Sequence, residues 1–355
     1  QFDWILLSCL LALTGVGVLM IYSATYQTVR ADLYIRQLQW CSMARVLFFI
    51  ILQIDYHSLV DLALPFYIFS LTLLVAVLFF GKRISGAKSW FAFGYFHFQP
   101  SEIAKIASIV LLARYLSDDS RGNLTLKDLG MACVIMGIPM FLIILQPDMG
   151  TTITFLPPLI LLLFLAGMRF RWILLAIAGG IASLPVFWLF LKQYQKARIL
   201  TFLDPTMDPL GSGYQIIQSK IAIGSGRILG KGLFSKATQA YLDFIPEKQT
   251  DFVFSILAED FGLIGVLIVL GIYFLLLARV FHAAKQSRDR VGTFIIMGFT
   301  AVFFFHVLVN IGMIIGLMPI TGLPLPLMSY GGSSLLSTIV GLAIVSNIYM
   351  RRFVN

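Results

Sequence analysis

The sequence predicts an all-α integral membrane protein with about ten transmembrane helices. Of its 355 residues, 59% are hydrophobic and only 12% are charged, and the mean hydropathy is +0.91. A soluble domain has about 25% charged residues, so this composition excludes one. The apolar residues form runs of about 20, the length that a helix needs to cross a bilayer. These runs do not alternate apolar and polar residues, which excludes the strands of an outer-membrane barrel.

Ten such runs are present, and we expect them to form one membrane domain over residues 1–355. No small-residue cleavage pattern follows the first run, so we expect an anchor there rather than a removed signal peptide. Because the chain begins at Gln1, we expect its natural start to be missing. The expected spans are residues 4–25, 34–54, 58–80, 101–117, 128–147, 150–168, 171–191, 252–279, 291–316 and 331–350.

The net charge of +9 is spread unevenly over the short loops. Ten spans put both termini on one side, and cytoplasmic loops carry the excess of Lys and Arg. The sequence therefore predicts that both termini are cytoplasmic. The loops on the side of the termini contain Arg114, Arg121, Lys127, Arg169, Arg171, Arg279, Lys285, Arg288, Arg290, Arg351 and Arg352, and the opposite short loops contain Arg30, Arg36, Lys82, Arg83 and Lys88.

One long polar segment, residues 192–250, separates the seventh and eighth expected spans and falls on the extracytoplasmic side. It carries eight Lys or Arg. Loops of about 60 residues escape the positive-inside rule, so these cations need another explanation. A phosphate-bearing lipid at the outer face suits them better than nucleic acid. Residues 214–223 have the pattern of a short helix, either in the membrane interface or packed within the loop.

The segment Gln99–Lys105 places a carboxylate and an ammonium in an apolar span. Pro100 and Ser101 are typical of a helix start, and Glu102 and Lys105 share a helical face because they are three residues apart. Charges at membrane depth cost about 3 kcal/mol each unless they are paired or face water. The two residues either line a cavity for a phosphate or sugar, or form a structural ion pair.

Asp148 lies in a break between two apolar runs. Irregular backbone at membrane depth persists only where protein or water satisfies it, so we expect Asp148 to face a cavity. The alternative is a plain outer turn in which Asp148 caps a helix.

The long loop interleaves glycines and cations in the stretch GSGRILGKG, residues 224–232. Glycine allows backbone N–H groups to approach an anion, and Lys or Arg supplies charge. The Walker spacing is absent, so this is not a P-loop. The alternative is a flexible, solvated loop.

Asp251 stands where the chain re-enters the membrane. A carboxylate at such a low-dielectric boundary can accept a proton as a general base, although a helix N-terminus also favours an acid. Glu259, about two turns further, could face the same cavity. His306 and Asn310 share a face of the ninth span, where an interhelical hydrogen bond is favoured over a ligand role.

No metal centre or disulfide framework is predicted. Cys9, Cys41 and Cys133 lie in apolar segments at spacings that suit neither, and the four His residues are scattered without a metal-binding motif.

The motifs together resemble the SEDS family of cell-wall polymerases over essentially the whole chain. TGLPLP (321–326) is closer to the RodA branch than to the FtsW branch. Gln249 is a departure, because many relatives have His there, which weakens any case for a catalytic histidine. The motifs are FQPSEIAKIA (98–107), QPDMGT (146–151), FLDPTMDPLGSGYQIIQSKIAIGSG (202–226), PEKQTDFVF (246–254) and PLPLMSYGGSSLL (324–336).

The resemblance implies an inverting peptidoglycan glycosyltransferase that polymerises lipid II during cell elongation. It implies a location in the bacterial cytoplasmic membrane, with the active site on the extracytoplasmic side and a class B penicillin-binding protein as partner. Asp251 aligns with the family's essential acid, as general base. No cofactor is implied, and a divalent cation at the pyrophosphates stays open. The expected substrate-binding residues are Glu102, Lys105, Asp148, Arg198, Gln218, Ser219, Lys220, Glu247 and Lys248.

Two other functions are weighed against this one. A lipid II flippase would also use intramembrane charges and broken helices, but near the midplane and accessible from both sides. A scaffold that only recruits a transpeptidase would not need Asp251.

Overall fold

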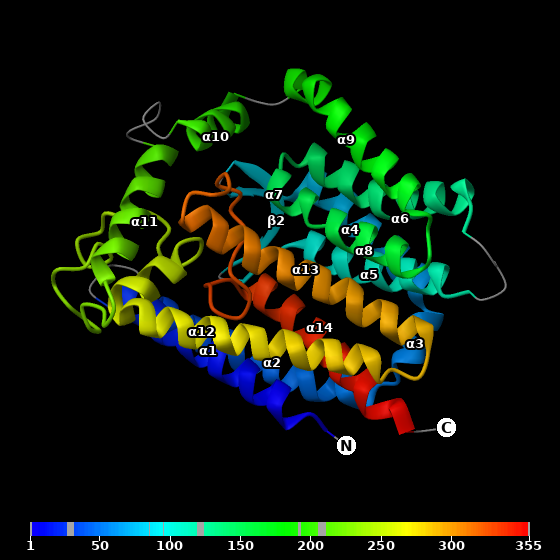
Figure 1. Ribbon diagram of the computed structural model, residues 1–355, viewed down its shortest axis with the longest axis horizontal. Helices are drawn as coiled ribbons and strands as arrows, with labels where there is room; N and C mark the ends of the chain where they lie inside the picture. Colours follow the sequence, from blue (N-terminus) through cyan, green and yellow to red (C-terminus); the bar gives the residue numbers. More distant parts are fainter. Residues whose placement is uncertain are drawn as a thin grey trace.

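The chain forms a bundle of helices with one small antiparallel sheet (Figure 1). The computed structural model describes residues 2–26, 32–84, 86–94, 96–118, 124–190, 193–204 and 211–353. The helices are α1 Trp4–Thr25, α2 Leu33–Gln53, α3 Tyr56–Asp61, α4 Ala63–Phe80, α5 Pro100–Leu116, α6 Leu126–Leu145, α7 Met149–Ile153, α8 Leu156–Leu165, α9 Phe170–Phe190, α10 Gln193–Leu203, α11 Ser212–Gly226, α12 Val253–Lys285, α13 Arg290–Ile314 and α14 Gly332–Met350, and the strands are β1 Lys82–Ile84, β2 Ala87–Phe93 and β3 Phe96–Phe98.

Each of the ten expected runs coincides with a helix or a pair of helices. The third run is divided into α3 and α4, and the sixth into α7 and α8. Among the described residues, seven helices are long and apolar enough to cross a membrane, namely α1, α2, α4, α6, α12, α13 and α14. The protein is therefore a mostly helical, multi-pass membrane protein.

Short polar side chains set several helix starts. Asp3 caps α1 by accepting from the N–H groups of Ile5 (3.1 Å) and Leu6 (3.0 Å). Thr125 and Asp128 form a reciprocal capping box at α6, and Pro100 occupies the first turn of α5. These side chains satisfy N–H groups that a helix start leaves without partners.

The two ends of the described chain lie at the same end of the bundle (Figure 1). Polar contacts join several helices there. Arg279 of α12 binds Asp3 at 2.8 Å, and Arg351 binds Asp55 at 3.2 Å. Tyr56 donates to Asp289, which caps α13. Residues distant in sequence thus form one polar face, which we call the terminal end.

The opposite end of the bundle, which we call the outer end, contains α11 and the sheet (Figure 1). It also contains two irregular segments, residues 227–252 and 315–331. The strands are ordered β1-β2-β3, with Phe91 opposite Phe98 in the antiparallel β2–β3 pair. The hydroxyl of Ser333 donates to the carbonyl of His97 at 2.9 Å and accepts from the N–H of Gln99 at 3.2 Å, so the sheet is attached to the start of α14.

The segment between α13 and α14 is held by side chains from three helices. Its sequence predicts a rigid outer loop, and the structure provides a physical reason for rigidity. Its backbone oxygens accept hydrogen bonds from buried side chains instead of water. The bonds are Asn310 Nδ2 to Leu323 O (2.8 Å), Tyr273 OH to Pro326 O (2.6 Å) and Gln37 Nε2 to Ser329 O (3.3 Å).

Helix α12 is broken at Gly262, whose φ is +63°. The segment 227–232 supplies the hydrogen bonds that the break removes. The N–H groups of Leu263 and Ile264 donate to the carbonyls of Arg227 and Ile228, and the N–H groups of Lys231 and Gly232 donate to those of Glu259 and Asp260. All four distances lie between 2.9 and 3.2 Å.

Because of the break, the part of α12 that can cross a membrane differs from the expected eighth span, residues 252–279. At about 1.5 Å per residue, residues 263–285 are about 34 Å long, enough to cross a hydrocarbon core of about 30 Å. The part of α12 before Gly262 is therefore not needed to reach that length. Glu259 and Asp260 then need not lie at the membrane centre.

Two of the glycines in residues 224–232, Gly226 and Gly230, allow this packing. A Cβ on Gly226 or Gly230 would collide with the backbone of Ala258 or Asp260, and Gly230 has φ +78°. The N–H groups of Lys231 and Gly232 are already bonded to α12. These two N–H groups are therefore not available to an anion. The segment is largely exposed, as the alternative of a solvated loop expects, but α12 holds its backbone.

Gly230→Ala should lower stability by about 3 kcal/mol, because positive φ and overlap with the Asp260 carbonyl both oppose a side chain. Gly232→Ala, with φ +85° but open space around its Cβ position, should cost only about 1 kcal/mol. The measurement is thermal unfolding in detergent. Helical Gly224, with open space at its Cβ position, is the control, and its alanine variant should be at least as stable as the parent. Equal melting temperatures for all three variants would contradict the close packing of residues 226–230 against α12.

Candidate functional site

Glu102 and Lys105 pair with each other and also line a pocket. Their charged atoms are 2.8 Å apart, and both side chains are buried. The hydroxyl of Ser337 on α14 donates to the second Glu102 oxygen. Glu102 and Lys105 therefore form an ion pair and also line a pocket.

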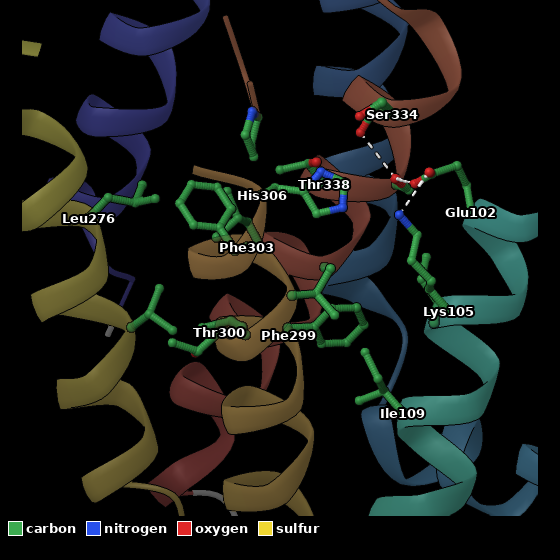
Figure 2. A pocket seen from close by; sticks show the side chains of 18 of the residues that line it. Glu102, Lys105, Ile109, Leu276, Phe299, Thr300, Phe303, His306, Ser334 and Thr338 are labelled. Atoms are coloured by element: carbon green, nitrogen blue, oxygen red, sulfur yellow. Dashed lines mark hydrogen bonds and ion pairs between the residues drawn. The ribbon is translucent and has the colours of Figure 1, made fainter. Parts of the chain in front are cut away.

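The pocket lies between α5, α12, α13 and α14 and has a cavity volume of about 50 Å³. Figure 2 shows that its two ends differ, with Glu102, Lys105 and His306 near one end and Ile109 and Phe299 near the other. The lining is therefore polar at one end and apolar along the rest.

His306 is a buried part of this pocket. Its Nδ1 lies 3.4 Å from the carbonyl oxygen of Pro324, and its Nε2 has no hydrogen-bond partner among the described residues. The expected interhelical hydrogen bond of His306 and Asn310 is therefore wrong, because their partners Pro324, Asp251 and Leu323 lie outside the helices.

Asp148 joins two of the sequence motifs. It caps α7 by accepting from the N–H of Thr151 at 3.1 Å. Its other carboxylate oxygen accepts from the side-chain amide of Gln99 at 3.0 Å. The capping alternative is thus what the structure contains, and Gln99 links it to the start of α5. The sequence indicated no role for Gln99, because its partner Asp148 is distant along the chain.

Asp251 lies just before α12 and is half-buried. Its backbone N–H donates to the carbonyl of Glu247 at 3.2 Å, and its own carbonyl accepts from Asn310 at 3.0 Å. Its Oδ2 is 3.8 Å from the position that a Cβ would occupy on Gly322, which has φ +71°. The carboxylate therefore lies beside the segment between α13 and α14.

Lys220 lies against the other end of that segment. Its ammonium and Cε contact the space in which a Cβ on Gly316 would stand, and the side chain is exposed. An acid and a cation thus flank residues 316–322 at the outer end.

The neighbours of Lys220 differ from it in their surroundings. Ser219 is fully buried, with its hydroxyl 2.8 Å from that of Ser255 and donating to Ile314 O at 3.0 Å. Gln218 is half-buried. In the helix predicted at 214–223, Ile216 is buried near Gly316 while Ile217 and Ile221 are exposed, so the three do not share one buried face.

Glu247 and Lys248 precede Asp251 and face different surroundings. Lys248 is buried, with its ammonium 2.5 Å from Ala240 O and 2.9 Å from Asp243. Glu247 is exposed and accepts from Gln249 at 3.3 Å. Arg198 belongs to α10, but its side chain lies outside the described residues.

Glu259 organises the long loop from inside the protein. Its side chain is fully buried and binds Lys231 at 2.6 Å, Ser225 at 3.2 Å and the N–H of Gln239 at 2.9 Å. Sequence reasoning gave it a place in a cavity with Asp251, but the carboxylate is engaged by the loop.

The part of the chain that the structure describes contains no group of three or more His, Cys, Asp or Glu that could hold a metal ion.

Comparisons with known proteins match nearly the whole chain to one family. A family model for cell cycle proteins of the FtsW/RodA/SpoVE type matches residues 3–353. A peptidoglycan glycosyltransferase MrdB from Escherichia coli is 41% identical, covering 99% of this chain and 94% of that protein. The peptidoglycan glycosyltransferase RodA of Treponema pallidum is 34% identical over 99% of this chain and 98% of that protein.

Two solved structures are similar to this chain over its whole length. One, from work on the coordination of polymerization and crosslinking by a peptidoglycan synthase complex, has a TM-score of 0.85 and 34% identity, covering 100% of this chain and 99% of that one. The crystal structure of the rod shape determining protein RodA of Thermus thermophilus has a TM-score of 0.76 and 30% identity, with the same coverage.

Lys105→Met should destabilise the fold by about 3–5 kcal/mol, because it leaves the buried Glu102 carboxylate without its counter-charge. The double variant Glu102→Gln with Lys105→Met should recover most of that loss. Thermal unfolding in detergent measures both. If the single and double variants melt together, well below the parent, the ion pair is not the reason for the loss.

Proposed function

The chain belongs to the FtsW/RodA/SpoVE family, and from this membership and the outer-end geometry we infer that it is a peptidoglycan glycosyltransferase of the bacterial inner membrane. We propose that it polymerises lipid II, with Asp251 as general base. The single observation that supports this is that Asp251 lies beside one end of residues 316–322 and Lys220 beside the other. Sugar transfer from a lipid diphosphate needs both an acid–base group and a cation.

The proposed reaction is a displacement at the anomeric carbon of the donor sugar. The hydroxyl oxygen of the acceptor attacks that carbon, and its proton passes to the Asp251 carboxylate. The bond from the anomeric carbon to the diphosphate oxygen breaks, and the diphosphate leaves with the electron pair. Attack from the face opposite the leaving group inverts an α-linked diphosphate into a β-1,4 bond.

The cations hold the diphosphates in this proposal. Lys220 and Arg198 neutralise the charge that grows on the leaving group. The pair Glu102–Lys105 lines a pocket whose lining includes neither Asp251 nor Lys220, and Asp148 is linked to the start of the same helix through Gln99. Gln218, Ser219, Glu247 and Lys248 complete the predicted substrate-binding set. Ser219 and Lys248 would act through the loop that they hold, since both are buried.

The remaining features follow from the same proposal. Ten transmembrane helices would place both termini in the cytoplasm and residues 192–250 outside. The terminal end contains the basic Arg279, Lys285 and Arg351, as the positive-inside rule requires for a cytoplasmic face. A class B penicillin-binding protein would be the partner, in line with the synthase complex that the fold resembles.

Asp251→Asn should reduce glycan synthesis by about 100-fold or more, because the amide cannot accept the acceptor's proton. The measurement is polymerisation of labelled lipid II by purified protein with its transpeptidase partner. Asp61→Asn, an exposed acid at the terminal end, is the matched control and should keep full activity. Near-normal synthesis by Asp251→Asn would remove the base assignment. Wild-type protein that moves lipid II across liposomes without polymerising it would instead favour the flippase.

Lys220→Ala and Arg198→Ala should each raise the apparent KM for lipid II about tenfold, as expected for the loss of a charge-assisted hydrogen bond. Lys236→Ala, an exposed cation of the same loop outside the predicted set, should not change it. Initial rates over a range of lipid II concentrations give the values. An equal rise for all three variants would mean that the loop attracts substrate only by its overall charge.

A further inference from the structure

Asn310 is a fully buried residue of α13 that contacts the backbone of Asp251. Its side-chain nitrogen donates to the carbonyl of Asp251 at 3.0 Å and to that of Leu323 at 2.8 Å. A carboxamide nitrogen has two N–H donors, so both are used. The two acceptors identify this atom as the nitrogen, because an oxygen could not donate to either carbonyl.

The second acceptor, the carbonyl of Leu323, belongs to the segment beside which the Asp251 carboxylate lies. Gly322 directly precedes Leu323 and lies beside Asp251 Oδ2. On the other side of this segment, the carbonyl of Thr321 packs against Gly150 at the start of α7, closer than a Cβ would allow. Residues 321–323 therefore form a wall between Asp251 and the Asp148 cap, and Asn310 ties the acid to that wall.

Among the described residues, only the nitrogen of the Asn310 carboxamide has hydrogen-bond partners. Its Oδ1 is buried and has no hydrogen-bond partner among the described residues, although a buried acceptor without a donor is destabilising. Both N–H donors of Asn310 point at the two carbonyls, and this joins the peptide of Asp251 to residues 321–323.

We propose that Asn310 is a positioning residue that sets the distance and angle between the Asp251 carboxylate and the wall 321–323. The proposal rests on the proposed function, in which Asp251 accepts the acceptor's proton. Without the amide, the peptide of Asp251 and the wall can move independently, and the carboxylate leaves the productive geometry. A shift of about 1 Å in such a group can cost about 100-fold in rate.

Asn347 provides a matched control for a purely structural role. It is also a buried asparagine whose Nδ2 donates to backbone carbonyls, those of Ile51, Leu52 and Ile54. Its Oδ1 likewise lacks a partner among the residues described. It lies at the terminal end, away from Asp251.

The kinetic test compares Asn310→Ala, Asn310→Asp and Asn347→Ala in lipid II polymerisation, normalised to folded protein. Both Asn310 variants should lower kcat about 10- to 100-fold with KM changed less than about threefold, since binding groups are untouched. Asn310→Gln, which keeps the two donors, should recover part of the rate. Asn347→Ala should lose stability but keep its kcat. A normal kcat for the Asn310 variants, or a change in KM alone, overturns the proposal.

A second readout needs no activity. In a background without the three natural cysteines, Asp251→Cys places a thiol at the position of the acid. Adding Asn310→Ala should change its alkylation rate by a water-soluble maleimide at least threefold, while Asn347→Ala should not. Equal rates in both backgrounds overturn the positioning role even if the chain is a polymerase. Changed rates in a protein that never polymerises lipid II would keep the positioning and reject the proposed function.

Discussion

The outer end of this protein depends on one constraint, that backbone leaving a regular helix near the membrane must find its hydrogen bonds inside the protein. Three irregular features meet this constraint in different ways. The break at Gly262 is satisfied by the backbone of residues 227–232. The start of α7 is satisfied by Asp148. The segment between α13 and α14 is satisfied by side chains of Gln37, Tyr273 and Asn310.

These solutions place chemistry at one end of the bundle. Because α12 is broken, its first nine residues can stand at the boundary and present Asp251 beside the segment 316–322 instead of within the apolar core. The buried charges nearby are compensated, with Lys105 against Glu102 and Lys231 against Glu259. Exposed Lys220 remains accessible to an anion. Acid, cation and pocket thus come from segments far apart in sequence.

Helix positions were predictable from the sequence because apolar runs of about 20 residues leave few alternatives in a bilayer. The Glu102–Lys105 contact was predictable because three-residue spacing fixes a shared face. The roles of Gly226 and Gly230 were not, since glycine signals both a close backbone approach and flexibility, and the segment that approaches is about 30 residues away. The partners of Gln99 and Glu259 were not predictable either, because they are set by tertiary packing, which the spacing of residues in the sequence does not show.

The central claim is that Asp251 acts on the acceptor sugar while cations of the long loop hold the diphosphate. A structure of the protein with its transpeptidase partner and a non-hydrolysable lipid II analogue tests it most directly. The account predicts an acceptor hydroxyl about 2.6–3.2 Å from the Asp251 carboxylate, with the diphosphate at Lys220. An analogue bound with its sugars and diphosphate away from residues 316–322 would contradict it.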